Sequence, residues 1–73
     1  MQLGKNLKYL RGKKSISLRN LAKEISTPHS QIHAIEMEII SNPGIRTVIK
    51  LADFFGITLD DFVKTDLSKK EDK

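Results

Sequence analysis

Apolar residues recur at helical spacing at the start of the chain. Leu3, Leu7 and Leu10 are separated by four and then three residues, which places them on one face of a helix over residues 3–14. Gly12 weakens the last turn of this helix, because glycine is a poor helix former. The pattern predicts an amphipathic helix whose leucines face a core.

Two short helices are predicted in residues 18–36, LRNLAKEISTPHSQIHAIE, with a polar break between them at residues 26–28. Ser17 is a suitable N-cap for the first of these helices, because its hydroxyl can accept a hydrogen bond from a backbone N–H group. Leu21 and Ile25 are expected to lie inward. The polar break at residues 26–28 ends this helix after about two turns.

The second helix of this pair is predicted to begin at the polar break. We expect Thr27 to be its N-cap and Pro28 to take the first helical position, where the missing N–H of proline is not needed. Ile32 and Ile35 form its inward face. The side chains nearer its outward face are those of His29, Ser30, His33, Ala34 and Met37.

A strong break at residues 42–44, Asn-Pro-Gly, precedes a fourth helix predicted over residues 45–55. Gly56 then favours a left-handed C-cap. Thr58 followed by Asp61 resembles a capping box, which opens a fifth, short helix. The apolar residues of the fourth and fifth helices are Val48, Leu51, Ala52, Phe55, Leu59, Phe62 and Val63.

The predicted fold class is all-α, a compact five-helix bundle in one domain over residues 1–66. No strand pattern and no internal repeat is found. Residues 67–73 are expected to form a charged, disordered tail, because their polar composition cannot support a core.

Positive charge is concentrated in the first half of the chain. The net charge is +4, with +6 over residues 1–35 and −2 over residues 36–73. A polyanion would be attracted to the N-terminal half. A merely solubilising surface would look the same, so charge alone does not decide the function.

The composition excludes several classes of site and location. The chain has no cysteine, which rules out disulfides and cysteine zinc sites and suits a reducing cytoplasm. No apolar run reaches the roughly 20 residues of a membrane span, and the N-terminus lacks the apolar segment of a signal peptide. We expect a soluble, cytoplasmic protein. It is not expected to be an enzyme, because no Gly-rich phosphate loop or nucleophilic triad is found.

Four motifs occur in a definite order along the chain. They are LKYLR at residues 7–11, ISLRNLA at 16–22, IHAIE at 32–36, and the pattern NPxxxTxxxLAxxxGxxxD at 42–60. In this order and spacing they resemble the Cro and CI-type (XRE family) helix-turn-helix DNA-binding domains of phage repressors and small bacterial regulators. The resemblance runs from about Leu3 to Val63 and implies the fold of those domains, with the third helix in the major groove.

The resemblance also implies roles for single residues. His29, Ser30 and Ala34 match positions that usually meet base edges, with His33 and Met37 beside them. Ser17, Leu18 and Arg19 match the phosphate-binding start of the supporting helix. The full set of implied DNA-binding positions is Ser17, Leu18, Arg19, Thr27, His29, Ser30, His33, Ala34 and Met37. Arg11 and Glu36 match a buried structural ion pair.

The chain departs from the family pattern at three places. Leu18 stands where a phosphate-binding Gln is common, and Ser26 stands where the turn usually has Gly, so a left-handed conformation there would be strained. The loop after the recognition helix, residues 37–40, has the sequence MEII and no basic residue. Few phosphate contacts are therefore expected on that side. Ile39 and Ile40 fit either a protein interface or packing beneath the fourth helix.

A metal site is the less favoured interpretation of His29, His33 and Glu36. Their spacing allows all three to face one side of a helix, as metal ligands sometimes do. No HExxH motif is present, however, and the resemblance assigns Glu36 to Arg11. We expect no metal and no cofactor.

The sequence thus predicts a sequence-specific DNA-binding transcriptional regulator, a repressor or controller that binds a palindromic operator in double-stranded DNA as a homodimer. The alternative is a protein-interaction module, such as an antitoxin-like partner protein with secondary DNA binding. For the surface between subunits, the first candidates are Phe54, Leu59, Phe62 and Val63, and the second are Ile39 and Ile40.

Overall fold

The computed structural model of the protein describes residues 3–40 and 43–70. Within these ranges the chain is all-α, as predicted, and no strand is present. The helices are α1 (Leu3–Lys14), α2 (Leu18–Glu24), α3 (His29–Glu36), α4 (Ile45–Phe55), α5 (Leu59–Lys64) and α6 (Leu67–Lys70). The bounds predicted for the first and fourth helices are confirmed, and α6 is added to the five helices expected.

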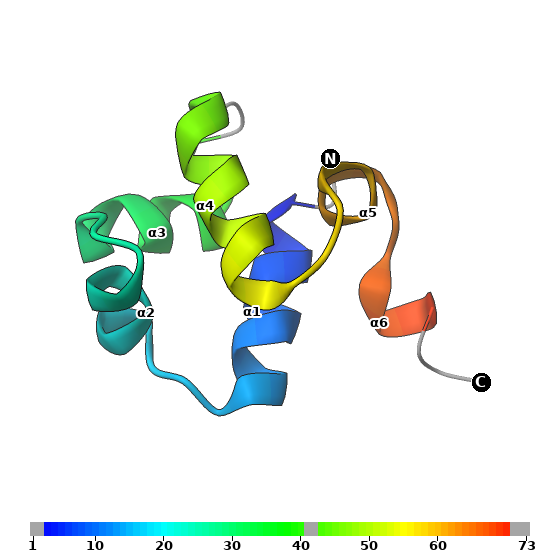
Figure 1. The fold of residues 1–73 in the computed structure, drawn as a ribbon, viewed down its shortest axis with the longest axis horizontal. Coiled ribbons are helices and arrows are strands. Elements are labelled where there is room, and N and C mark those ends of the chain that lie inside the picture. Colours follow the sequence, from blue (N-terminus) through cyan, green and yellow to red (C-terminus); the bar gives the residue numbers. More distant parts are fainter. Residues whose placement is uncertain (1–2, 41–42, 71–73) are drawn as a thin grey trace.

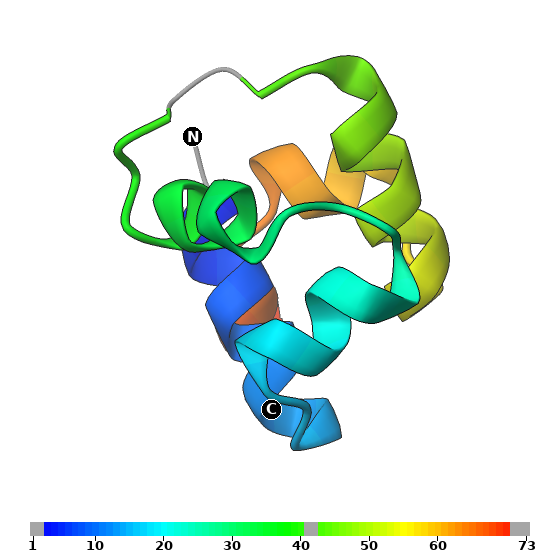
Figure 2. The same ribbon diagram turned by 90° about the vertical axis from the view of Figure 1, so that its left-hand side faces the viewer.

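The helices form two groups around α1. Figure 1 shows α1 in the centre, α2 and α3 together on the left, and α5 and α6 on the right. In Figure 2 the left-hand side of that view faces the reader, so α2 and α3 are seen from outside. α1 packs against α3, α5 and α6, whereas α4 packs against α5. The α2–α3 pair therefore lies at one end of the molecule.

The core contains the residues that the helical spacing placed inward. Leu7, Leu21, Ile32, Leu51 and Phe62 have no exposed surface, and they come from five different helices. Each helix thus contributes an apolar face to one shared core, which is how a short chain buries enough apolar surface to fold. Phe62, expected as a candidate for a surface between subunits, belongs to this core instead.

The predicted helix caps are confirmed at three positions. The Ser17 hydroxyl accepts a hydrogen bond from the Asn20 backbone N–H at 3.0 Å, and the Thr58 hydroxyl accepts one from the Asp61 N–H at 3.1 Å. Gly56 ends α4 in the left-handed conformation, with φ of 69°. The two hydroxyls satisfy N–H groups that have no partner within the helix itself, whereas the Gly56 N–H donates to carbonyls at the end of α4.

The predicted cap by Thr27 is wrong. Pro28 takes the N-cap position of α3 and not the first helical position predicted for it, and no side chain caps that helix. The Thr27 backbone N–H donates instead to the Ala22 carbonyl at 3.0 Å, and its hydroxyl donates to the Ile25 carbonyl at 3.2 Å. Thr27 therefore completes the end of α2, because its hydrogen bonds are directed backwards along the chain.

The turn between α2 and α3 is built on a left-handed serine. Ser26 has a φ of 53°, in agreement with its place where related domains have glycine. Its backbone N–H donates to the Lys23 carbonyl at 3.3 Å, while that of Thr27 reaches Ala22. This pair of bonds is a Schellman motif. The left-handed conformation costs a non-glycine residue about 1–2 kcal/mol.

Gly4 allows α1 and α3 to approach closely. A Cβ atom at this position would lie only 2.6 Å from the backbone carbonyl oxygen of Ile35. Any larger residue would therefore push the two helices apart, since a carbonyl in a helix cannot move by itself. Gly12 is different, because a Cβ there would meet nothing within 4 Å.

The beginning of the predicted tail belongs to the fold. Leu67 is 6% exposed and lies in the core, and α6 begins at this residue. Asn6 on α1 holds this segment in place, since its side-chain oxygen accepts from the Leu67 N–H at 3.0 Å. Its amide nitrogen donates to the Phe62 and Thr65 carbonyls at 2.7 and 2.6 Å. The prediction of a disordered tail from residue 67 did not include this anchored segment. Residues 71–73 of the predicted tail lie outside the described part of the chain.

Candidate nucleic-acid interface

The α2–turn–α3 unit presents one face of α3 to solvent. Ile32, Ile35 and Glu36 are buried on its inner face. His29, Ser30, His33 and Met37 are exposed, and Ala34 is half-buried at the margin of that face. Because buried and exposed positions alternate with helical period, the packing of α3 fixes which side chains point outward.

The predicted base-contact residues therefore share one surface. His29, Ser30 and His33 are exposed, and the Met37 side chain beside them is 55% exposed. A hydroxyl, two imidazoles and a thioether offer hydrogen-bonding and apolar groups along this helix. The surface has the chemical variety needed to distinguish base edges in a groove.

The start of α2 offers fewer of the predicted contacts. Ser17 uses its hydroxyl to cap the helix. Leu18 is half-buried and packs against the core, whereas Arg19 is exposed. Thr27 is only 8% exposed and its hydroxyl is occupied by Ile25. Of the predicted positions outside α3, Arg19 is the one that presents a charged side chain to solvent.

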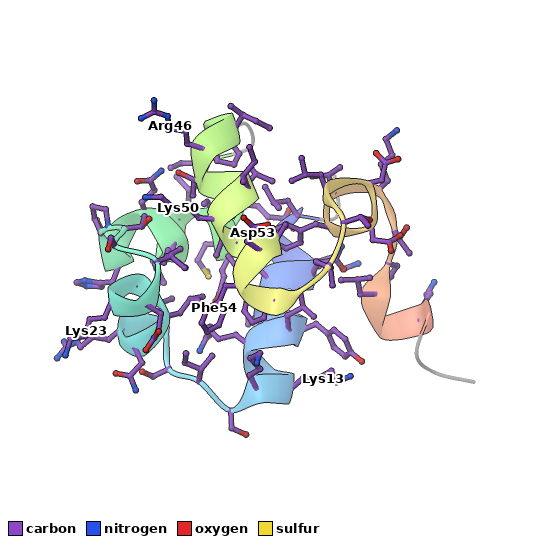
Figure 3. The ribbon with its side chains drawn as sticks, viewed as in Figure 1. Lys13, Lys23, Arg46, Lys50, Asp53 and Phe54 are labelled. Atoms are coloured by element: carbon purple, nitrogen blue, oxygen red, sulfur yellow. The ribbon has the colours of Figure 1, made fainter. Side chains whose placement is uncertain are left out.

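Positive charge lies beside α3 on the α2 side. Arg19, Lys23 and His29 line a shallow hollow between α2 and the beginning of α3. Figure 3 shows Lys23 at the outer edge of this side, far from Lys13 on α1. A polyanion that approaches the outer face of α3 would meet these groups first.

The predicted ion pair between Arg11 and Glu36 is confirmed. The Arg11 Nε donates to Glu36 Oε2 at 2.6 Å, and a terminal guanidinium nitrogen donates to Oε1 at 3.1 Å. A further guanidinium nitrogen donates to the Ile16 carbonyl at 3.1 Å. The hydrogen bond to Glu36 raises the pKa of Arg11, and partial burial of the guanidinium opposes that rise. The pair ties α3 to α1, and the Arg11 bond to Ile16 ties both to the segment that leads into α2.

The sequence patterns did not identify the contact between α3 and α4. The Gln31 Nε2 donates to the Thr47 hydroxyl at 3.2 Å, and both residues are half-buried. Thr47 belongs to the motif at residues 42–60, but that motif does not reveal its partner. Gln31, the third residue of α3, lies between exposed Ser30 and buried Ile32. A polar side chain at such a boundary position was the one sequence signal for a contact with another helix.

The described residues give no support to a metal site. No group of three histidine, acidic or cysteine side chains in that part of the chain is placed to hold a metal ion. Glu36 is occupied by Arg11. None of the described helices has the length and the apolar character that crossing a membrane requires.

The comparison with family models identifies one match. The model of a helix-turn-helix domain matches residues 4–67, from the start of α1 to the first residue of α6. No match was found among curated proteins or among solved structures. The matched segment contains α2, the turn at Ser26, α3 and the helices that support them. The chain belongs to the DNA-binding helix-turn-helix domain family.

Proposed function

We propose that the protein is a sequence-specific DNA-binding transcriptional regulator that inserts α3 into the major groove. The observation that carries this proposal is the outward face of α3, which presents His29, Ser30 and His33 to solvent. This face lies beside the hollow lined by Arg19 and Lys23, called the basic hollow below. An α-helix with its side chains is about 10–12 Å in diameter, which fits the roughly 12 Å width of the major groove.

The residues divide into two roles. Ser30 and the two histidines of α3 are suited to hydrogen bonds with base edges, and Ala34 to contact with a thymine methyl group. Arg19 is suited to a phosphate oxygen, which fixes position on the duplex but carries no sequence information. Thr27 makes no contact in this proposal, because its side chain is buried and its hydroxyl donates to the Ile25 carbonyl.

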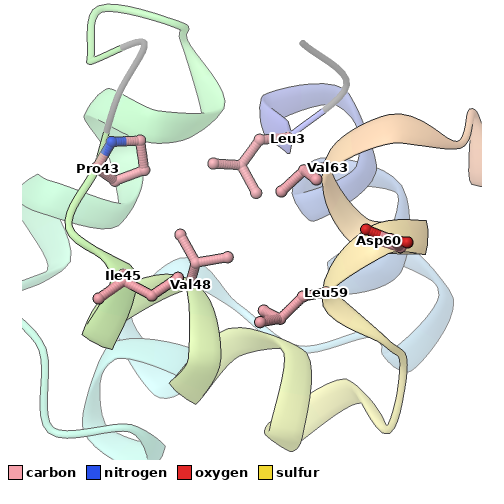
Figure 4. Close-up of a pocket in the computed structure, with 7 residues that line it drawn as sticks. All are labelled: Leu3, Pro43, Ile45, Val48, Leu59, Asp60 and Val63. Carbon is pink, nitrogen blue, oxygen red and sulfur yellow. The ribbon is translucent and has the colours of Figure 1, made fainter.

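Binding as a homodimer to a palindromic operator is part of the proposal. One module of this size reads few base pairs, and two half-sites supply the specificity that one lacks. Figure 4 shows an apolar hollow between the beginnings of α1, α4 and α5. It is lined by Leu3, Pro43, Ile45, Val48, Leu59, Asp60 and Val63. Ile45 and Leu59 at its border are 63% and 38% exposed, which favours this hollow as the surface between subunits.

A protein-interaction module is the second candidate function. Ile39 is 73% exposed and Met37 is 55% exposed, so the loop after α3 does not bury these side chains beneath α4. Exposed apolar groups close together favour contact with another protein. The family match and the basic hollow favour DNA binding instead.

Selection of bound fragments from a random DNA library at moderate salt tests the proposed function. We expect enrichment of a palindrome with half-sites about 34 Å apart, one helical turn. Ser30→Ala should narrow the gap between this operator and random DNA by about 1–3 kcal/mol, because a base contact is lost. Selection that enriches no sequence would overturn the proposal in favour of the protein-interaction module.

A further inference from the structure

A helix in the major groove lies between two phosphate walls, one on each strand. Arg19 and Lys23 of α2 line the hollow on one side of α3, which suits them to the phosphates of one wall. On the other side of α3 the loop 37–40 has no basic residue. The sequence alone therefore predicted few phosphate contacts on that side. The structure places another element on that side. Figure 3 shows Arg46, at the start of α4, projecting toward the side of the molecule that α2 and α3 occupy.

We propose that α4 supplies the second phosphate-binding flank, through the Arg46 guanidinium and the Gln31 side-chain amide held by Thr47. This inference rests on the proposed function. It adds a contact to the second DNA strand, made by residues to which the family resemblance assigned no DNA contact. The partner is a backbone phosphate of that strand, so the contact adds affinity without sequence preference.

Gln31 is oriented before DNA arrives. Its Nε2 donates one hydrogen to the Thr47 hydroxyl across the α3–α4 junction at 3.2 Å. A side-chain amide nitrogen carries two hydrogens, so a second hydrogen remains for a phosphate oxygen. A side chain already held in one conformation loses little conformational freedom when it binds. Thr47 is therefore a positioning residue that acts through Gln31.

Arg46 is adjacent to Thr47 in the first turn of α4. It is exposed, and it has no ion-pair partner among residues 3–40 and 43–70. A guanidinium is suited to phosphate because its planar set of donors matches the phosphate oxygens. The charged side chain of Arg46 is thus adjacent in sequence to Thr47, the residue that holds the neutral donor Gln31.

Lys50, one turn further along α4, does not belong to this flank. It lines a hollow together with Glu24 and Asp53, whose carboxylates repel a phosphate. Figure 3 shows Lys50 and Asp53 on the same exposed length of α4. Lys50 is therefore the matched control for Arg46, since it carries the same charge and lies on the same helix but has acidic neighbours.

The test measures binding to a short duplex of random sequence over a range of salt concentrations. Arg46→Ala should make the slope of log affinity against log salt shallower by about one unit, because one fewer counterion is released. Lys50→Ala and Lys13→Ala should leave that slope unchanged. If Arg46→Ala behaves like Lys13→Ala, or if Lys50→Ala produces the change, the proposed flank is wrong.

Gln31 and Thr47 should have a different signature, because their contact is neutral. Gln31→Ala should weaken binding to random and selected duplexes by the same factor, with the salt slope unchanged. Thr47→Val should weaken binding by the same factor, whereas Thr47→Ser, which keeps the hydroxyl, should bind like the unaltered protein. The double variant Gln31→Ala with Thr47→Val should lose no more affinity than Gln31→Ala alone. Additive losses, or full affinity in Thr47→Val, would overturn the role of Thr47.

Arg19→Ala separates this inference from the proposed function. If it lowers the salt slope while Arg46→Ala does not, the protein binds DNA but the α4 flank is wrong. If neither variant lowers the slope, and selection finds no sequence, the proposed function itself fails. Circular dichroism of each free variant checks that its helices are intact, so that a loss of affinity reports on the contact.

Discussion

At the residue scale, the ion pair between Arg11 and Glu36 is asymmetric. The Glu36 side chain is 4% exposed, whereas that of Arg11 is 22% exposed. Water can therefore rehydrate the arginine if its partner is lost, but it cannot reach the carboxylate in the same way. Breaking a buried pair by removal of one partner costs more than the pair contributes, because it leaves a buried charge unpaired.

We expect Arg11→Ala to destabilise the protein more than Glu36→Ala. Loss of the arginine leaves the buried Glu36 carboxylate unpaired and should cost about 3–5 kcal/mol, the range for a broken buried pair. Glu36→Ala should cost less, because Arg11 keeps its bond to the Ile16 carbonyl and partial access to water. Urea unfolding of both variants measures the difference. Equal losses would contradict the asymmetry.

The sequence predicted some side-chain contacts between helices and missed others. Arg11 and Glu36 were predicted as a pair because each belongs to a recognisable motif. Asn6 belongs to no motif, and its hydrogen bonds to Phe62, Thr65 and Leu67 join positions more than 50 residues apart. Local patterns contain no information on such a contact, because it exists only once the helices have packed.

At the scale of elements, helix positions were more predictable than helix distances. The spacing of Leu3, Leu7 and Leu10 predicts α1 and its buried face, because periodicity is a local property. The close crossing of α1 and α3 depends on a single hydrogen atom at Gly4 facing the Ile35 carbonyl. A glycine in a helical pattern gives no sign of whether it is a weak point or a contact.

Gly4 and Gly12 provide a test within one helix. Gly4→Ala should destabilise the protein by about 1–3 kcal/mol, the cost of overpacking, because the new Cβ meets backbone that must shift. Gly12→Ala should stabilise it by about 0.5–1 kcal/mol, because alanine is the better helix former and the site is open. Thermal unfolding compares the two. A stabilising Gly4→Ala would show that α1 and α3 can separate without loss.

At the scale of the whole molecule, the candidate DNA surface was predictable on one side of α3. The exposed residues of α3 and Arg19 were expected, since the motif order placed them in a helix-turn-helix unit. The contribution proposed for α4 was not expected, because Gln31 and Thr47 meet only after α4 folds back against α3. Of the residues expected at a surface between subunits, Leu59 is exposed, whereas Phe62 is buried in the core of the single chain.

The apolar hollow between α1, α4 and α5 is suited to hold two copies of the chain together. In a two-fold dimer the same surface meets itself, so each subunit must offer both a hollow and a projecting apolar group. Ile45 and Leu59 project at the border of the hollow that Val63 and Leu3 help to line. A charge at either projecting position would be buried unpaired between two copies.

Ile45→Asp should therefore convert the proposed dimer to a monomer in sedimentation, and Leu59→Lys should do the same. Ile39→Asp is the matched control, because Ile39 is 73% exposed but lies outside the hollow. The monomeric variants should still bind a half-site, with α3 unchanged, while they lose the higher affinity for the full palindrome that two linked modules provide. If Ile39→Asp alone abolishes the dimer, the subunits meet at the loop after α3. If the unaltered protein sediments as a monomer at high concentration, both with and without DNA, the proposed homodimer is wrong.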